Sequence, residues 1–154
     1  MSCENKCPLH AGFEGLGVLG LRLFLAYEFF EAGLEKWNGQ NWFADIQGQF
    51  PFPFNVLPAD LNWALATGAE LLLPVLLVLG FFTRFSAIGL FILTAVAWAA
   101  VHAGAGYNVC QNGYKMALIY LVMLLPLITQ GAGKLSIDAF LRSKYPAKKW
   151  LKLC

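Results

Sequence analysis

Four long apolar stretches constrain this chain more than any other feature, at about residues 16–33, 61–82, 85–102 and 116–130. Each is close to the ~20 residues that a helix needs to cross ~30 Å of hydrocarbon. Only 13% of the residues are charged, whereas a soluble domain averages about 25%, so a water-soluble fold would have too little polar surface to cover these stretches. A membrane-spanning segment must also satisfy its own backbone hydrogen bonds, which favours helices. The sequence therefore predicts an all-α protein, an integral membrane four-helix bundle.

The remaining segments give the predicted bundle, residues 16–133, a cytoplasmic N-terminal arm at 1–15 and a basic cytoplasmic tail at 134–154. Within the bundle, residues 37–60 are rich in Trp, Phe, Pro and Asn, and the run Phe-Pro-Phe-Pro-Phe-Asn at 50–55 cannot form a regular helix because proline breaks its hydrogen-bond ladder. Aromatic side chains partition well to the headgroup level of a membrane. We expect an aromatic outer loop that caps the bundle, or alternatively a lid over a site.

The basic residues predict how the bundle is oriented, because cytoplasmic loops carry an excess of Lys and Arg. With four crossings, both termini lie on the side of the tight turn at Thr83-Arg84. That side carries eight basic residues and the other side carries two, Lys36 and Lys115. The eight are Lys6, Arg84, Lys134, Arg142, Lys144, Lys148, Lys149 and Lys152. This division predicts a multi-pass membrane protein with both termini in the cytoplasm.

Ionisable residues inside apolar spans are costly, so each one is a candidate for function or for a buried pair. We expect Arg22 and Glu70 to form a structural ion pair. At 100° per residue, Glu28 and Glu31 share one face of the first helix, and the topology brings His102 to the same outer depth. Two carboxylates and an imidazole can bind a metal, pass protons or hold a quinol headgroup. We therefore predict a catalytic polar site of Glu28, Glu31 and His102; the alternative is a set of isolated structural pairs.

The N-terminal arm carries a weaker metal-binding signal in Cys3, Cys7 and His10. Soft thiolates can hold copper(I) or zinc, but zinc sites usually have two residues between the cysteines and four firm ligands. No sequence pattern supports nucleic-acid binding.

Several short motifs together resemble the DoxX family of small four-helix membrane proteins across nearly the whole chain. They are Leu-Arg-Leu at 21–23, Glu-Phe-Phe-Glu-Ala-Gly at 28–33, Glu-Lys-Trp at 35–37, Asn-Trp-Phe-Ala at 41–44, Glu-Leu-Leu-Leu at 70–73, Leu-Gly-Phe-Phe-Thr-Arg at 79–84 and Gly-Lys-Leu-Ser-Ile-Asp at 133–138. The Glu-Phe-Phe-Glu-Ala-Gly motif is most similar to the HvfX-like branch, which is associated with maturation of copper-binding, ribosomally made peptides. Many relatives carry His-Gly where this chain has Glu31-Ala32-Gly33, so any role of that histidine does not transfer.

The resemblance implies a link to membrane redox processes, including the small subunit of a thiosulfate:quinone oxidoreductase. The leading functional hypothesis is a redox-associated accessory protein of the bacterial inner membrane, quinone-linked and serving a peptide-modifying or copper-handling partner. Quinone and copper are the cofactors it suggests, and the residues alone name neither. The alternatives are a non-catalytic membrane anchor or scaffold subunit, and a small metal or solute permease.

Overall fold

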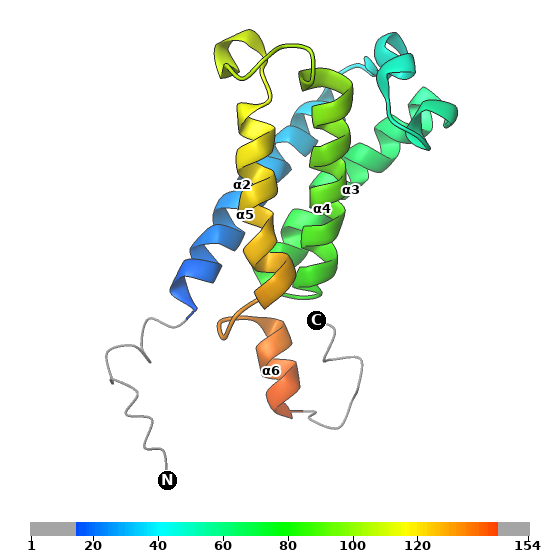
Figure 1. Ribbon diagram of the computed structural model, residues 1–154. Helices are drawn as coiled ribbons and strands as arrows, with labels where there is room; N and C mark the ends of the chain where they lie inside the picture. The colour runs from blue at the N-terminus through cyan, green and yellow to red at the C-terminus, as the bar shows by residue number, and fades with distance from the viewer. Residues whose placement is uncertain (1–14, 145–154) are drawn as a thin grey trace.

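The computed structural model describes residues 15–144, except for the side chain of Arg142. This part of the chain contains helices and turns and no β-strand, so the predicted all-α class is confirmed for it (Figure 1). The metal-ligand prediction for Cys3, Cys7 and His10 lies outside the described residues.

The long helices are α2 (Leu16–Asn38), α3 (Ala59–Leu79), α4 (Thr83–Ala97) and α5 (Lys115–Gln130). Five shorter segments complete the described chain: η1 (Phe43–Gln49), η2 (Phe54–Val56), η3 (Trp98–His102), η4 (Val109–Gln111) and α6 (Ile137–Lys144). The π-helix η3 continues α4 directly. The first helix runs on to Asn38, beyond the predicted end at residue 33, because the charged residues 35 and 36 continue the helix instead of opening the loop.

The four long helices pack side by side in the order α2, α3, α4 and α5, and α5 also contacts α2 (Figure 1). Their shared core is built from small and aliphatic side chains, with Leu25, Leu77, Leu90, Leu124 and Leu127 fully buried. A second, smaller core of Phe43, Phe50 and Ala100 lies where the loop elements η1 and η2 meet α3 and η3. This second core positions the site described below.

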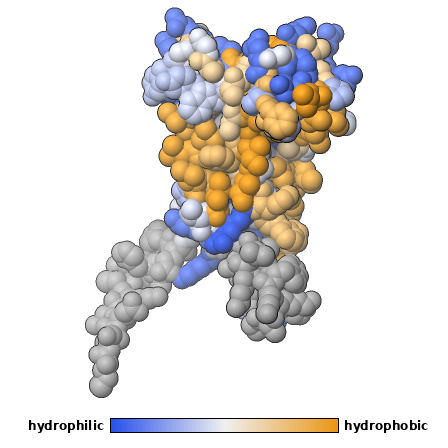
Figure 2. Space-filling view, turned by 45° about the vertical axis from the view of Figure 1, so that its right-hand side comes forward, coloured by the Kyte–Doolittle hydropathy of each residue, from blue (hydrophilic) through white to orange (hydrophobic). Residues whose placement is uncertain are grey.

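The face of the bundle drawn in Figure 2 is strongly apolar at its middle, where an orange band lies between two more hydrophilic ends. Exposed large side chains include Phe24, Leu65, Leu72, Ile92 and Val122. Two helices, Ala59–Leu79 and Thr83–His102, are long and apolar enough to cross a membrane, and Lys115–Gln130 is a shorter apolar helix. A water-soluble protein rarely exposes so large a contiguous apolar surface, which suggests a membrane protein.

The turn between α3 and α4 is organised by a buried arginine. Helix α3 ends in a Schellman motif, in which Gly80 N–H donates to the Leu77 carbonyl (3.0 Å) and Phe81 N–H to the Leu76 carbonyl (3.0 Å). Gly80 has φ +65°, and a Cβ there would lie 2.6 Å from Arg22 Nη2. Glycine is therefore required both by the backbone conformation and by the packing.

Arg22 itself, 1% exposed, donates four hydrogen bonds to main-chain carbonyls. Two of these are at the end of α3, Leu77 (2.7 Å) and Val78 (2.7 Å), and two follow α5, Ala132 (3.0 Å) and Leu135 (2.7 Å). The expected Arg22–Glu70 ion pair is therefore wrong. Backbone carbonyls at a helix C-terminus carry partial negative charge, so they can accept the hydrogen bonds of the guanidinium in place of Glu70. The carboxylate whose charge acts on Arg22 is that of Asp138.

Asp138 fastens α6 to the same end of the bundle. Its carboxylate is buried and accepts hydrogen bonds from the N–H groups of Phe82 (3.2 Å) and Thr83 (3.3 Å), at the start of α4. Its own N–H donates to the Gly80 carbonyl (3.0 Å). An acidic side chain at a helix N-terminus satisfies free N–H groups and complements the helix dipole. The segment after α5 therefore packs against the α3–α4 turn and belongs to the folded bundle.

Candidate functional site

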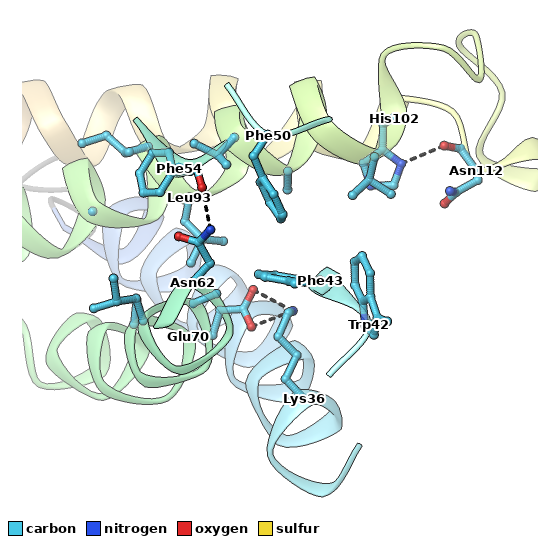
Figure 3. Close-up of a pocket in the computed structure, with 18 residues that line it drawn as sticks. Lys36, Trp42, Phe43, Phe50, Phe54, Asn62, Glu70, Leu93, His102 and Asn112 are labelled. Atoms are coloured by element: carbon cyan, nitrogen blue, oxygen red, sulfur yellow. Dashed lines mark hydrogen bonds and ion pairs between the residues drawn. The ribbon is translucent and has the colours of Figure 1, made fainter. Parts of the chain in front are cut away.

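A cavity of about 670 Å³ lies between α3 and α4, on the side of the bundle where η1, η2 and η3 meet (Figure 3). This volume falls within the ~300–1,000 Å³ of typical small-molecule sites. Most of the wall is apolar, and the polar groups that line it are Lys36, Asn62, Glu70, His102 and Asn112. The apolar wall is formed by Trp42, Phe43, Phe50, Phe54, Leu65, Ala66, Ala69, Gly89, Ile92, Leu93, Val96, Ala97 and Val101.

The aromatic loop supplies one wall of this cavity. Phe43 packs against Phe50 (ring centroids 5.0 Å apart) and Trp63 (5.1 Å), and Trp42 contacts Phe43 edge-on at 4.9 Å. Tilted and edge-to-face arrangements are favourable geometries for aromatic pairs, so these contacts hold the rings in place. Two roles were predicted for the loop, a cap on the bundle or a lid over a site. Its position in the cavity wall agrees better with a lid. Phe52, in contrast, is 82% exposed and lines no part of the cavity.

A buried ion pair joins α2 and α3 at the cavity wall. Lys36 Nζ lies 2.7 Å from Glu70 Oε2 and 2.9 Å from Oε1, and only 4% of the Glu70 side chain is exposed. Gly33 favours the pair, because a Cβ there would lie 3.0 Å from Glu70 and would push the two helices apart by a few tenths of an ångström. Lys36 follows Gly33 by one helical turn and therefore reaches the same neighbour. The charge pattern of the sequence identifies Lys36 only as one of the two basic residues of the outer side and does not predict this pair; the spacing of Lys36 from Gly33 was the available signal.

His102 reaches the cavity because α4 ends in the π-helix η3. A π-helix has a wider turn than an α-helix, so it rotates the residues that follow it and is frequent at functional sites. Val101 and His102 both line the cavity as a result. The His102 ring is held by a hydrogen bond between Nδ1 and the Asn112 carbonyl (2.7 Å), which Figure 3 shows as a dashed line.

The predicted site of Glu28, Glu31 and His102 is not assembled in this form. Glu28 accepts a hydrogen bond from the Tyr120 hydroxyl of α5, Glu31 is exposed, and neither lines the cavity that His102 lines. The helical spacing places the two glutamates on one face of α2. That face is not the one that contacts the cavity, which α2 lines through Lys36. The carboxylate that lies in the cavity wall with His102 is Glu70.

Within residues 15–144, no three His, Cys, Asp or Glu side chains are grouped so that they could hold a metal ion. The polar groups of the cavity fit an organic headgroup instead. Lys36 offers N–H donors, Glu70 and Asn62 offer oxygens, and the aromatic side chains of the wall can pack against a planar ring.

Comparisons with known proteins agree with this fold. A sequence profile named DoxX matches residues 17–103, which contain α2, the aromatic loop, α3, α4 and η3. A protein of Haemophilus influenzae is 62% identical over 148 residues, covering 96% of this chain and 98% of the relative, and a second protein of the same organism is 29% identical over 124 residues, covering 77% and 85%. Both relatives are described as uncharacterized proteins, and no solved structure matches. With more than half of its length matched by the profile, the chain belongs to the DoxX family.

Proposed function

We propose that this protein is a membrane-embedded accessory protein of a redox system that binds a quinone or quinol in the cavity between α3 and α4. The single observation that carries this function is the cavity itself: an aromatic slot of about 670 Å³ with a buried Lys36–Glu70 ion pair in its wall. An apolar interior tolerates such a pair only where it is well bonded, and ionisable groups at membrane depth usually mark a substrate or proton pathway.

The position of the cavity suits a ligand that arrives from the bilayer. Leu65 of α3 and Ile92 of α4 line it, and these side chains are also 53% and 51% exposed on the apolar outer surface. The cavity therefore adjoins the surface that lipid would cover. A quinone combines a planar polar headgroup with a long apolar tail, so its tail can stay between these helices while its ring enters the slot.

The HvfX-like sequence motif supports a place beside a system that matures copper-binding peptides, with a soluble peptide-modifying or redox protein as partner. In this proposal copper belongs to that system. A deletion strain in which the peptide is still fully modified would rule this partnership out. The non-catalytic anchor and the small permease are the alternatives that the ligand experiment below separates.

The topology is part of the same proposal. The four helices α2–α5 cross the inner membrane, and the end that carries Arg84, Lys134 and Lys144 faces the cytoplasm. Alkaline phosphatase fused after residue 154 is expected to be inactive, whereas a cytoplasmic green fluorescent fusion at the same point is expected to fluoresce. Active phosphatase at that fusion point would overturn the orientation and place the cavity near the cytoplasmic leaflet.

The proposed function is tested by filling the cavity. Ala97 lines it, whereas Ala99, two residues further along the same helical segment, is exposed and does not. Protein purified from membranes in mild detergent is extracted with solvent, and quinone is quantified per mole of protein. We expect Ala97→Phe to lower the bound quinone at least tenfold and Ala99→Phe to leave it unchanged.

Quinone that is absent from the wild-type protein, or equally retained by both variants, would overturn quinone binding in this cavity. A protein that holds no quinone but still binds a soluble partner would support the non-catalytic anchor. A protein that holds no quinone but takes up solute into vesicles would support the permease.

A further inference from the structure

We infer that the cavity selects the reduced, hydroxyl-bearing form of its ligand, the quinol, over the oxidised quinone, and that His102 and Asn62 are the residues that make this distinction. This inference rests on the proposed function and adds the redox state of the headgroup to it. It follows from which hydrogen-bonding groups of the cavity already have a partner in the protein and which could still bind a ligand.

The first step is the tautomer of His102. Its Nδ1 lies 2.7 Å from the Asn112 backbone carbonyl, which can only accept a hydrogen bond. Nδ1 therefore carries the hydrogen. In the neutral imidazole the other nitrogen, Nε2, then has no hydrogen and acts as an acceptor. The backbone of the loop that holds Asn112 thus fixes the tautomer in which the neutral His102 ring presents an acceptor to a ligand.

The same reasoning fixes the orientation of the Asn62 carboxamide. Its Nδ2 donates to the Phe54 carbonyl at 2.7 Å, as Figure 3 shows, and this partner again only accepts. Asn62 is 4% exposed, and its Oδ1 has no hydrogen-bond partner among the described residues. An unpaired buried acceptor costs free energy, so this position favours a ligand that brings a hydrogen-bond donor.

Together these groups make the cavity rich in acceptors. Glu70 adds a carboxylate, whose oxygens already face Lys36 Nζ at 2.7 and 2.9 Å, and Lys36 is the one cationic donor in the described wall. A quinol carries two hydroxyl groups, and each can donate to one acceptor while accepting from a donor such as Lys36. A quinone has carbonyl oxygens alone, so it can accept from Lys36 but leaves the acceptors of Asn62 and His102 unpaired. Sites built for a hydroxyl discriminate strongly against analogues that lack it.

The test uses three probes with the same decyl tail: a 1,4-benzoquinol, its quinone, and the dimethyl ether of the quinol, which keeps the ring and the tail but has no O–H group. Their dissociation constants are measured under anaerobic conditions on wild-type protein in nanodiscs freed of native quinone. We expect the quinol to bind at least about tenfold tighter than the quinone or the ether, since tenfold corresponds to 1.4 kcal/mol, or about one hydrogen bond.

Two variants assign the preference to its residues. Asn62→Leu and His102→Phe are each expected to bring the quinol-to-quinone ratio toward one. Thr67→Val is the matched control, because Thr67 is buried in α3 with an unpartnered hydroxyl but does not line the cavity, and its ratio should stay at the wild-type value. Because the ratio is measured within one variant, a partly misfolded fraction lowers both affinities and cancels.

The outcomes separate the two claims. A quinone that binds as tightly as the quinol, or a preference unchanged in both variants, overturns the inference and leaves quinone binding intact. Failure of all three probes to bind overturns the proposed function as well.

Discussion

Replacing Arg22 with methionine is expected to destabilise the folded protein by ~3 kcal/mol or more. The guanidinium makes four hydrogen bonds to carbonyls from two parts of the chain, at the end of α3 and after α5. Bonds to a charged donor contribute about 1.5–3 kcal/mol each, and each buried carbonyl left unpaired adds a desolvation cost. Methionine has a similar length but no donor, so all four carbonyls lose their partner together. Thermal unfolding in a fixed detergent, followed by circular dichroism, measures the loss.

Two further variants sharpen this prediction. Arg22→Lys keeps the charge, but a single ammonium group cannot reach the four carbonyls that the planar guanidinium spans, so the loss should be intermediate. Arg84→Met is the matched control: Arg84 donates one exposed hydrogen bond to the Thr129 carbonyl (3.1 Å), and its removal should cost about 1 kcal/mol or less. Equal stability of the Arg22→Met and Arg84→Met proteins would contradict the claim that Arg22 stabilises the fold by joining the end of α3 to the segment after α5.

Breaking the Lys36–Glu70 pair is expected to separate stability from ligand binding. Lys36→Met leaves the Glu70 carboxylate buried without its partner, and removing one member of a buried pair typically costs ~3–5 kcal/mol. The double variant Lys36→Met/Glu70→Met removes both charges, and apolar replacement of a whole pair is often neutral or stabilising. We therefore expect the single variant to be unstable, the double variant to recover most of the wild-type stability, and both to lose the bound quinone.

A thermal unfolding series and the quinone content of the same preparations check this second prediction. The pair is a structural element alone if the double variant retains wild-type quinone. It is a binding element alone if the single variant is as stable as the wild type.

The helices were predictable from the sequence because their signal is local. Apolar stretches at 61–82 and 116–130 correspond to α3 at Ala59–Leu79 and α5 at Lys115–Gln130. The partners of the charged residues were not predictable in this way. A charge inside an apolar span demands a partner, but a sequence does not show that free carbonyls at a helix end can supply it, as they do for Arg22. Glu70 then paired with Lys36, which Gly33 brings close.

The candidate site was partly predictable for the same reason. His102 and the aromatic loop, above all Trp42, Phe43 and Phe52, were expected at one outer site. His102, Trp42 and Phe43 line the cavity, whereas Phe52 does not. The carboxylate of that cavity comes from α3 instead of α2, because helical phase relates residues on one helix but does not say which neighbour each face meets. The five-residue π-helix at Trp98–His102, which turns His102 to the cavity, has no signature in the apolar pattern. The role of Glu28 and Glu31 stays a prediction.

Photolabelling with an azido-quinone that carries an alkyl tail tests most directly whether the cavity holds a quinone headgroup. Labelled protein is digested, and the modified peptides are mapped by mass spectrometry. Adducts are predicted on the cavity wall, within residues 42–66 and 92–102, with labelling strongly reduced in Ala97→Phe and unchanged in Ala99→Phe. Adducts concentrated on the outward-facing side chains of α2, such as Leu23 and Phe24, with no effect of Ala97→Phe, would contradict it.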